Sequence, residues 1–421
     1  MRFAIVLTAA LLATATSAAF GVTGRELLFF AAALAIAARL RPQYVEPWAT
    51  RALLVLSVAC AALSAADAFL RAREPEMLRL GPRPEHSLLA RYPRLAETAG
   101  IEIGDFAQLP VPTATAETRF VRFATDEFGF RNEPGAGRRP IDVLVLGDSN
   151  AVGPGTSQDL IWPAQLDMGR TYNLGASGNA WHAQLTFELE SPRLELAPGA
   201  RLVWMLCVDD VDESYADEAP REPPPSALRR ARVALDLFER DSVLGRWREW
   251  AALHVLRRIP ERSRWLESRR LPDGSELVFY LILARHRNQA ADKLGRAAHR
   301  AGLARALLET AALARARGLA VDVVIAPSKE EVFGWLLDGQ PPWSNPPSGF
   351  AAMACSFARE ASARCLDLGP AFRSESRRRY EADGSLLWWR DDYHWNEAGQ
   401  ALAAREIAAW LRAEITSTPI H

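Results

Sequence analysis

The chain has 421 residues, a formal net charge of −1 and 49% hydrophobic residues. The balanced charge gives no electrostatic basis for binding nucleic acid, and the length exceeds one ordinary domain, so we expect one large domain with additional segments. The four cysteines lack the spacing of a metal site, so we predict no metal and no cofactor.

The first 72 residues are predicted to be membrane material. Apolar runs at 3–22 and 52–70 each have arginine at an edge, and a shorter apolar run lies at 27–38. Because a span needs about 20 apolar residues, we expect two or three spans, or a signal peptide followed by two spans. The three arginines of 39–51 favour a cytoplasmic connection, so the run at 52–70 crosses outward and everything after Arg71 lies on the periplasmic or extracytoplasmic side.

A linker or pre-domain is expected at 73–124, because this stretch contains proline and arginine and shows weak periodicity. The main domain is then predicted to run from 125 to 421. An insertion at about 213–300 has a different character, with arginine-rich helical patterns and one apolar strand at 274–283. We expect this insertion to form a mostly helical cover over one side of the site.

The organising motif is 141–153, IDVLVLGDSNAVG. Its apolar first half predicts a strand buried on both faces of a parallel sheet. Gly147 permits a tight turn, and Ser149 then lies at the carboxyl end of the strand, where open α/β sheets bind ligands. Ser149 is therefore a candidate nucleophile. The alternative is an ordinary loop in which Ser149 or Asp148 caps a helix.

Further buried strands are predicted after this motif, with helical patterns between them. They lie at 170–173, 201–207, 319–327 and 365–368, and a closing helix is expected at 397–411. Alternating strands and helices predict an α/β fold with a mostly parallel sheet.

A second candidate element lies near the end of the chain, where RDDYHWNEAG occupies 390–399. A serine nucleophile needs a base that takes its proton, and the base needs a carboxylate that orients it. His394 is the candidate base. Asp391 is the candidate partner, while the adjacent Asp392 substitutes only if the loop takes a different path.

The serine turn and the D-x-x-H-W-N stretch together resemble the SGNH (GDSL-type) hydrolase and acyltransferase superfamily, in its membrane-tethered envelope form. The resemblance covers about 125 to the C-terminus, and the stretch at 125–132 is similar to an N-x-x-G-x-R segment that precedes the serine strand in such proteins. It implies a three-layer α/β/α, flavodoxin-like fold and a Ser149, His394 and Asp391 triad.

The resemblance also implies an oxyanion hole made by the backbone N–H groups of Ser149 and Gly178 and by a third donor at position 209. Here Asp209 stands where the family usually has asparagine, and Cys207 stands where it usually has glycine. A charged carboxylate repels a developing oxyanion, and losing one donor costs about 10²–10³ in rate. Three alternatives stay open: a protonated Asp209, donation by Asn179, or an inactive site.

Four other positions carry lesser expectations. Lys329 is expected at the rim of the cleft or on a solvated helix start, without a chemical role. Cys355 and Cys365 flank a helix end and a strand, and an oxidising compartment permits a disulfide between them without deciding it. His182 is interpreted as a packing or surface residue.

We predict a serine esterase that acts on carbohydrate or lipid O-acyl groups at the outer face of the membrane. One alternative is an O-acetyltransferase that modifies an envelope polysaccharide. Another is a catalytically inactive protein that keeps the fold for binding or scaffolding. The expected partners are an acylated carbohydrate or other ester and the membrane, without nucleic acid.

Overall fold

The computed structural model describes residues 92–108, 117–178, 180–210, 266–280, 297–337 and 349–415, and the single helical positions 58, 62 and 65. The chain divides into two compact units. The elements described below all belong to the unit made of Gly81–Arg221 and Leu256–His421. The predicted membrane segments and most of the predicted insertion lie outside the described residues.

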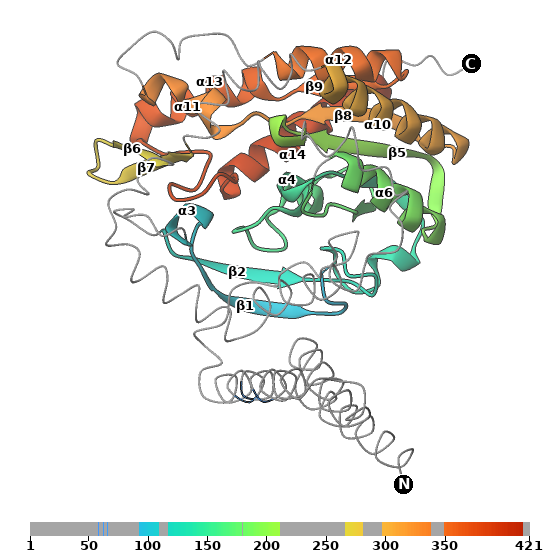
Figure 1. The fold of residues 1–421 in the computed structure, drawn as a ribbon, viewed down its shortest axis with the longest axis horizontal. Helices are drawn as coiled ribbons and strands as arrows, with labels where there is room; N and C mark the ends of the chain where they lie inside the picture. The colour runs from blue at the N-terminus through green and yellow to red at the C-terminus, as the bar shows by residue number, and fades with distance from the viewer. Residues whose placement is uncertain are drawn as a thin grey trace, which may run out of the picture. The chain divides into compact units, whose positions relative to one another are not determined.

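A parallel sheet of five strands forms the centre of this unit, in the order β4-β3-β5-β8-β9 (Figure 1). Each neighbouring pair in the sheet is parallel. The strands are β3 (Ile141–Leu146), β4 (Thr171–Asn173), β5 (Leu196–Leu206), β8 (Ala320–Ile325) and β9 (Arg364–Asp367). The predicted α/β fold and the mostly parallel sheet are therefore confirmed.

Two apolar cores lie on opposite faces of the sheet, because successive side chains of a strand point to opposite sides. In β5, Leu202 and Trp204 belong to one core, whereas Val203 and Met205 belong to the other. The first core includes buried side chains of α6 (Ala180–Glu190), α10 (Ala297–Ala316) and α12 (Phe350–Glu360). The second includes those of α5 (Trp162–Gln165), α11 (Lys329–Leu337), α13 (Gly369–Asp383) and α14 (Glu397–Ile415).

The remaining short helices lie near strand ends. They are α3 (Asp105–Gln108), η1 (Ala136–Arg138), α4 (Ser149–Val152), η2 (Ser191–Arg193) and η3 (Val208–Asp210).

Two small antiparallel hairpins stand apart from the central sheet (Figure 1). The first pairs β1 (Glu97–Glu102) with β2 (Arg119–Ala124) and lies within the predicted linker. The second pairs β6 (Leu266–Arg270) with β7 (Glu276–Tyr280) and contains the apolar strand expected inside the insertion. Both hairpins contact the segment that carries His394, as shown below.

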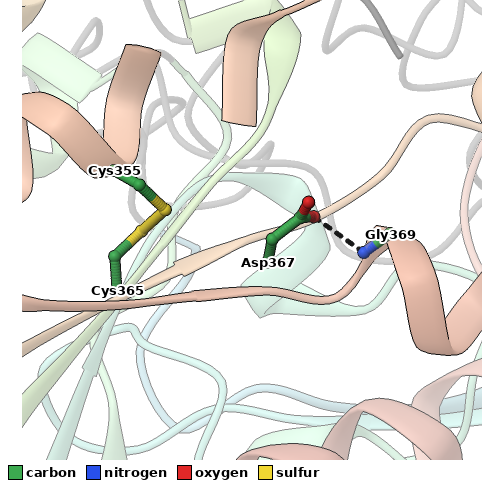
Figure 2. Close-up of a disulfide and its surroundings, with 4 residues drawn as sticks. All are labelled: Cys355, Cys365, Asp367 and Gly369. Carbon is green, nitrogen blue, oxygen red and sulfur yellow. Dashed lines mark hydrogen bonds between the residues drawn. A yellow bond between two sulfur atoms is a disulfide. The ribbon is translucent and has the colours of Figure 1, made fainter. Parts of the chain in front are cut away.

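Figure 2 shows that Cys355 of α12 and Cys365 of β9 form a disulfide, with Cα atoms 5.3 Å apart. This bond answers the question that the sequence left open. It ties a helix of the first core to the edge strand of the sheet.

The expected membrane spans lie outside the described residues, apart from three isolated positions. Among the helices that the structure describes, none combines the length and hydropathy that crossing a bilayer requires.

Candidate active site

Ser149 is the first residue of helix α4, directly after β3 and the Gly147-Asp148 turn. A Cβ at Gly147 would lie 2.9 Å from the carbonyl oxygen of Met205, so the neighbouring strand requires glycine here. Asp148 caps the helix by accepting a hydrogen bond from the backbone N–H of Asn150. Ser149 itself is half-buried, as a nucleophile that must meet a substrate requires.

Cys207 supports this turn from the neighbouring strand β5. Its thiol donates to Oδ2 of the buried Asp148 at 3.1 Å, and its backbone N–H donates to Asp210. Burial raises the pKa of Asp148, while the hydrogen bonds from Cys207 and Asn150 act in the opposite direction. Cys207, one of the two positions that depart from the resembled pattern, therefore holds the cap of the serine helix.

Arg131 secures the other end of α4. Its guanidinium is buried and donates to the carbonyl oxygens of Val152, Gly153 and Thr156, and also to the side chain of Gln158. Burial lowers the pKa of Arg131 to about 10, which still leaves it charged at neutral pH. Arg131 thus binds carbonyl groups at the end of the serine helix and just after it.

His394 is paired with Asp392, and this corrects the prediction of Asp391 as its partner. Nδ1 of His394 lies 2.8 Å from Oδ1 of Asp392, and the same oxygen accepts the backbone N–H of His394. Both side chains are 2% exposed. The loop folds back on itself, so a carboxylate two positions before the histidine reaches the ring.

Asp391 anchors the loop to the β1–β2 segment. Its carboxylate accepts the backbone N–H groups of Gly104 and Glu117 and an N–H of Arg119. Gly104 is required here, because a Cβ would lie 2.1 Å from the carbonyl oxygen of Asp391. Asp391 is therefore a structural anchor in this geometry.

Arg119 bridges the two aspartates. Its Nη1 lies 3.0 Å from Asp391 and its Nη2 lies 2.5 Å from Asp392, and all three side chains are almost fully buried. Burial acts to raise the pKa of Asp392, but the opposite charges and hydrogen bonds of His394 and Arg119 outweigh it and lower that pKa to about 2. Asp392 is thus an anion at neutral pH.

Because Asp392 is ionised, Nδ1 of His394 carries the proton of their hydrogen bond and Nε2 is the basic atom. Burial lowers the pKa of His394, but the Asp392 carboxylate and its hydrogen bond, with Asp105 and Asp148, raise it above its ordinary value. Nε2 is buried and has no hydrogen-bond partner among the described residues.

The His394 ring and the serine turn lie within electrostatic range of each other, since the Asp148 carboxylate raises the pKa of His394. Asp148 directly precedes Ser149. The contact of Ser149 with His394 itself stays a prediction.

The predicted oxyanion donors are described to different extents. Gly178 is exposed at the end of the loop after β4, and a Cβ there would lie 2.8 Å from the Cβ of His182. Asp209 lies in η3 directly after β5, but its side chain and the whole of Asn179 fall outside the described residues. The third donor stays a prediction. His182 packs against the glycine loop.

Among the described residues, two groups have metal-ligand atoms within 4.8 Å of one another: Asp105, Asp392 and His394, and Asp148, Cys207 and Asp210. Each group is already engaged by protein partners, since Arg119 and His394 bind Asp392 while Cys207 binds both of its aspartates. We assign neither group to a metal.

Sequence reasoning missed Arg119, Asp105 and the central position of Lys329. Asp105 Oδ2 lies 3.7 Å from Nδ1 of His394, and it comes from the predicted linker. The ammonium of Lys329 is buried against the backbone of 389–392. The sequence offers one signal for the role of Arg119, which is an arginine followed far along the chain by two adjacent aspartates. This pattern is too common to identify a site.

Comparison with known families gives a match over part of the chain. Residues 283–419 match the model of the SGNH hydrolase-like domain, acetyltransferase AlgX. The matched segment contains Lys329, Asp392 and His394 and ends before the last residues of the chain, whereas Ser149 lies outside it. No curated protein matches the chain.

Proposed function

We propose, from the premise that the chain carries an SGNH hydrolase-like domain, that it transfers acyl groups through a triad of Ser149, His394 and Asp392. One observation carries the proposal: Asp392 holds Nδ1 of His394 at 2.8 Å, which leaves a buried Nε2 without a partner among the described residues. A base in this state is ready to take a proton from a hydroxyl.

In the first step, Oγ of Ser149 attacks the carbonyl carbon of an ester while Nε2 of His394 takes the hydroxyl proton. His394 then returns this proton to the leaving alcohol, so that an acyl group remains on Ser149. The negative charge of the tetrahedral intermediate is received by the backbone N–H groups of Ser149 and Gly178.

In the second step, an acceptor hydroxyl attacks the acyl-serine while Nε2 takes its proton, and Ser149 is then released with that proton. We favour the hydroxyl of an envelope carbohydrate as the acceptor, and acetyl as the acyl group. The description of the matched family model as an acetyltransferase supports this choice. The chain is then an O-acetyltransferase.

Ester hydrolysis is the second candidate, with water as the acceptor for the same acyl-enzyme. The exposure of Gly178 and the half-buried position of Ser149 favour it, because solvent reaches this edge of the site. A non-catalytic binding protein is the remaining alternative, and the carboxylate at Asp209 is the feature that supports it.

We also propose that this domain works on the extracytoplasmic side, held to the membrane by the N-terminal segment. The Cys355–Cys365 disulfide supports an oxidising compartment. Intact cells and spheroplasts treated with a protease test this proposal. Degradation of the domain in spheroplasts supports it, whereas protection until the cells are lysed contradicts it.

The catalytic proposal is tested on the purified full-length chain with a fluorophosphonate probe and p-nitrophenyl acetate. We expect the fluorophosphonate probe to label Ser149. In the separate assay, acylation of Ser149 by p-nitrophenyl acetate should release p-nitrophenol in a burst. Ser149→Ala should reduce the rate by about 10³-fold or more. Ser268→Ala, which alters an exposed serine of β6, is the matched control and should behave as the wild type.

A carbohydrate acceptor added to the same reaction separates the two catalytic candidates. Acetylated oligosaccharide that forms with Ser149 and not with Ser149→Ala supports transfer, while acetate release that no acceptor diverts supports hydrolysis. Absence of both labelling and turnover in the wild type favours the binding protein.

A further inference from the structure

Lys329 begins helix α11, four residues after the end of β8. The sequence predicts a rim or solvated position for it, but the structure buries it to 1% exposure. A fully buried lysine is rare and costs free energy unless its ammonium is well paired. Its partners therefore show what the position requires.

The ammonium is surrounded by the backbone of the loop that leads to His394. Nζ donates to the carbonyl oxygens of Trp389 at 2.8 Å, Arg390 at 3.0 Å and Asp392 at 2.8 Å. These three bonds use all three N–H donors of a charged lysine. The rings of Phe106 and Phe279 lie near the charge, with centroids 5.6 and 5.7 Å from Nζ.

Three carbonyl oxygens that point at one place repel each other, because each carries a partial negative charge. A cation at their centre removes this repulsion and satisfies buried acceptors. One of these carbonyls belongs to Asp392, whose side chain orients His394. The ammonium thus contacts the residue on which the position of the base depends.

The other supports of this loop hold its side chains or single carbonyls, and one of them is the N–H of Phe106, which binds the carbonyl of Asp391. Arg119 binds the side chains of Asp391 and Asp392, and β7 binds the backbone once, through the N–H of Val278 and the carbonyl of Arg390. Lys329 differs from these supports because it binds three carbonyls of 389–392 at once.

We propose that Lys329 is a positioning residue for the histidine base: its ammonium gathers the carbonyls of Trp389, Arg390 and Asp392 and so holds the Asp392 carboxylate against His394. This inference rests on the proposed function, since it assigns a role in the same site. Lys329 does not touch the substrate or the reacting atoms.

Two opposing effects act on the pKa of Lys329. Burial lowers its pKa to about 7, and the carboxylates of Glu330, Asp392, Asp391 and Glu117 act in the opposite direction. The three carbonyl oxygens that accept from Nζ favour the protonated form.

The test compares Lys329→Met with the wild type in full-length protein. Methionine keeps the length of the side chain and removes the donors and the charge. Because misplacing a catalytic group by about 1 Å costs on the order of 10² in rate, we expect kcat and the rate of Ser149 acylation to fall by about that factor. KM should change little. Arg378→Met, which removes an exposed cation of α13, is the control and should match the wild type.

The pH profile distinguishes positioning from simple loss of charge. If Lys329 holds Asp392 against His394, its removal weakens the contact that raises the pKa of His394, and the acidic limb of the profile moves to lower pH. An acidic limb that moves to higher pH, or that stays in place, overturns the inference. So does a Lys329→Met variant with the wild-type kcat.

If Lys329→Met does not fold, Lys329→Gln carries the test, because its amide keeps two N–H donors without the charge. A lower kcat with the acidic limb at lower pH supports the inference, and wild-type values overturn it. Failure of the proposed function itself is separate, since in that case the wild type is not acylated at Ser149.

Discussion

The two halves of the site are held together by different kinds of contact. Around Ser149, the cap from Asp148 comes from the adjacent residue, and Arg131 reaches the end of α4 from 18 positions before Ser149. Around His394, the supports come from Arg119, 273 positions away from Asp392, and from Lys329, 63 positions away from it. The nucleophile is positioned by a local turn that Cys207 supports from β5, whereas the base is positioned by contacts from distant parts of the chain.

This difference explains why the sequence predicts the nucleophile half of the site better than the base half. A strand, a glycine and a capping aspartate predict the geometry at Ser149 directly. At the base, the spacing of two adjacent aspartates does not say which one reaches the ring. Gly104, Glu117 and Arg119 decide this choice, because they bind the carboxylate of Asp391 and so leave Asp392 to orient His394.

The largest expected effect separates Asp392 from Asp391. Asp392→Asn should lower kcat by about 10³–10⁴-fold, because the amide cannot stabilise the imidazolium or fix its tautomer. Asp391→Asn should lower kcat much less and reduce the free energy of unfolding instead, since it loses a charged partner of Arg119. Steady-state kinetics and urea denaturation of both variants measure this. A greater loss of kcat in Asp391→Asn would restore Asp391 as the partner of the base.

A smaller effect should appear in the pH dependence of kcat/KM. The base must be neutral, so activity should fall about tenfold per pH unit below the pKa of His394. Because the carboxylate of Asp392 raises this pKa above the ordinary value of 6.5, the fall should begin above pH 6.5. The limb should move to lower pH in the residual activity of Asp392→Asn. A limb at or below pH 6.5 in the wild type would contradict the pairing seen here.

The smallest effect is expected at the nucleophile half, where Cys207 supports Asp148. Cys207→Ala removes the hydrogen bond to a buried carboxylate, which should cost about 1–3 kcal/mol of stability and a few-fold in kcat. Cys207→Ser keeps a donor and should retain more of both. Thermal unfolding and acylation of Ser149 by the fluorophosphonate probe give the two readouts. Equal behaviour of the alanine and serine variants would show that the thiol does not support the turn.

Much of the fold follows from local pattern. The apolar runs at 141–146 and 319–327 predict β3 and β8, because a continuous β-branched run suits a strand covered on both faces. The closing helix α14 also follows, although it extends beyond 411 to Ile415. The helix α5 is short because Leu166 has extended backbone angles and ends it.

In the predicted linker, the local sequence pattern predicts the least of the observed structure. Its weak periodicity hides a hairpin of two six-residue strands, whose pairing depends on contacts between residues 17–27 positions apart. The importance of Arg119 within it depends on a loop near the other end of the chain. No local signal in 92–124 points to that partner.

The sequence by itself determined the α/β class, the serine turn and the presence of a histidine with neighbouring carboxylates, because each depends on residues close together in the chain. Only the tertiary structure decided that Asp392 is the partner of His394, that Asp391 is an anchor and that Lys329 is buried. These outcomes depend on which distant groups compete for the same carboxylates and carbonyls. Such competition is resolved by packing, since a buried charge or carbonyl must find its partner wherever the fold provides one.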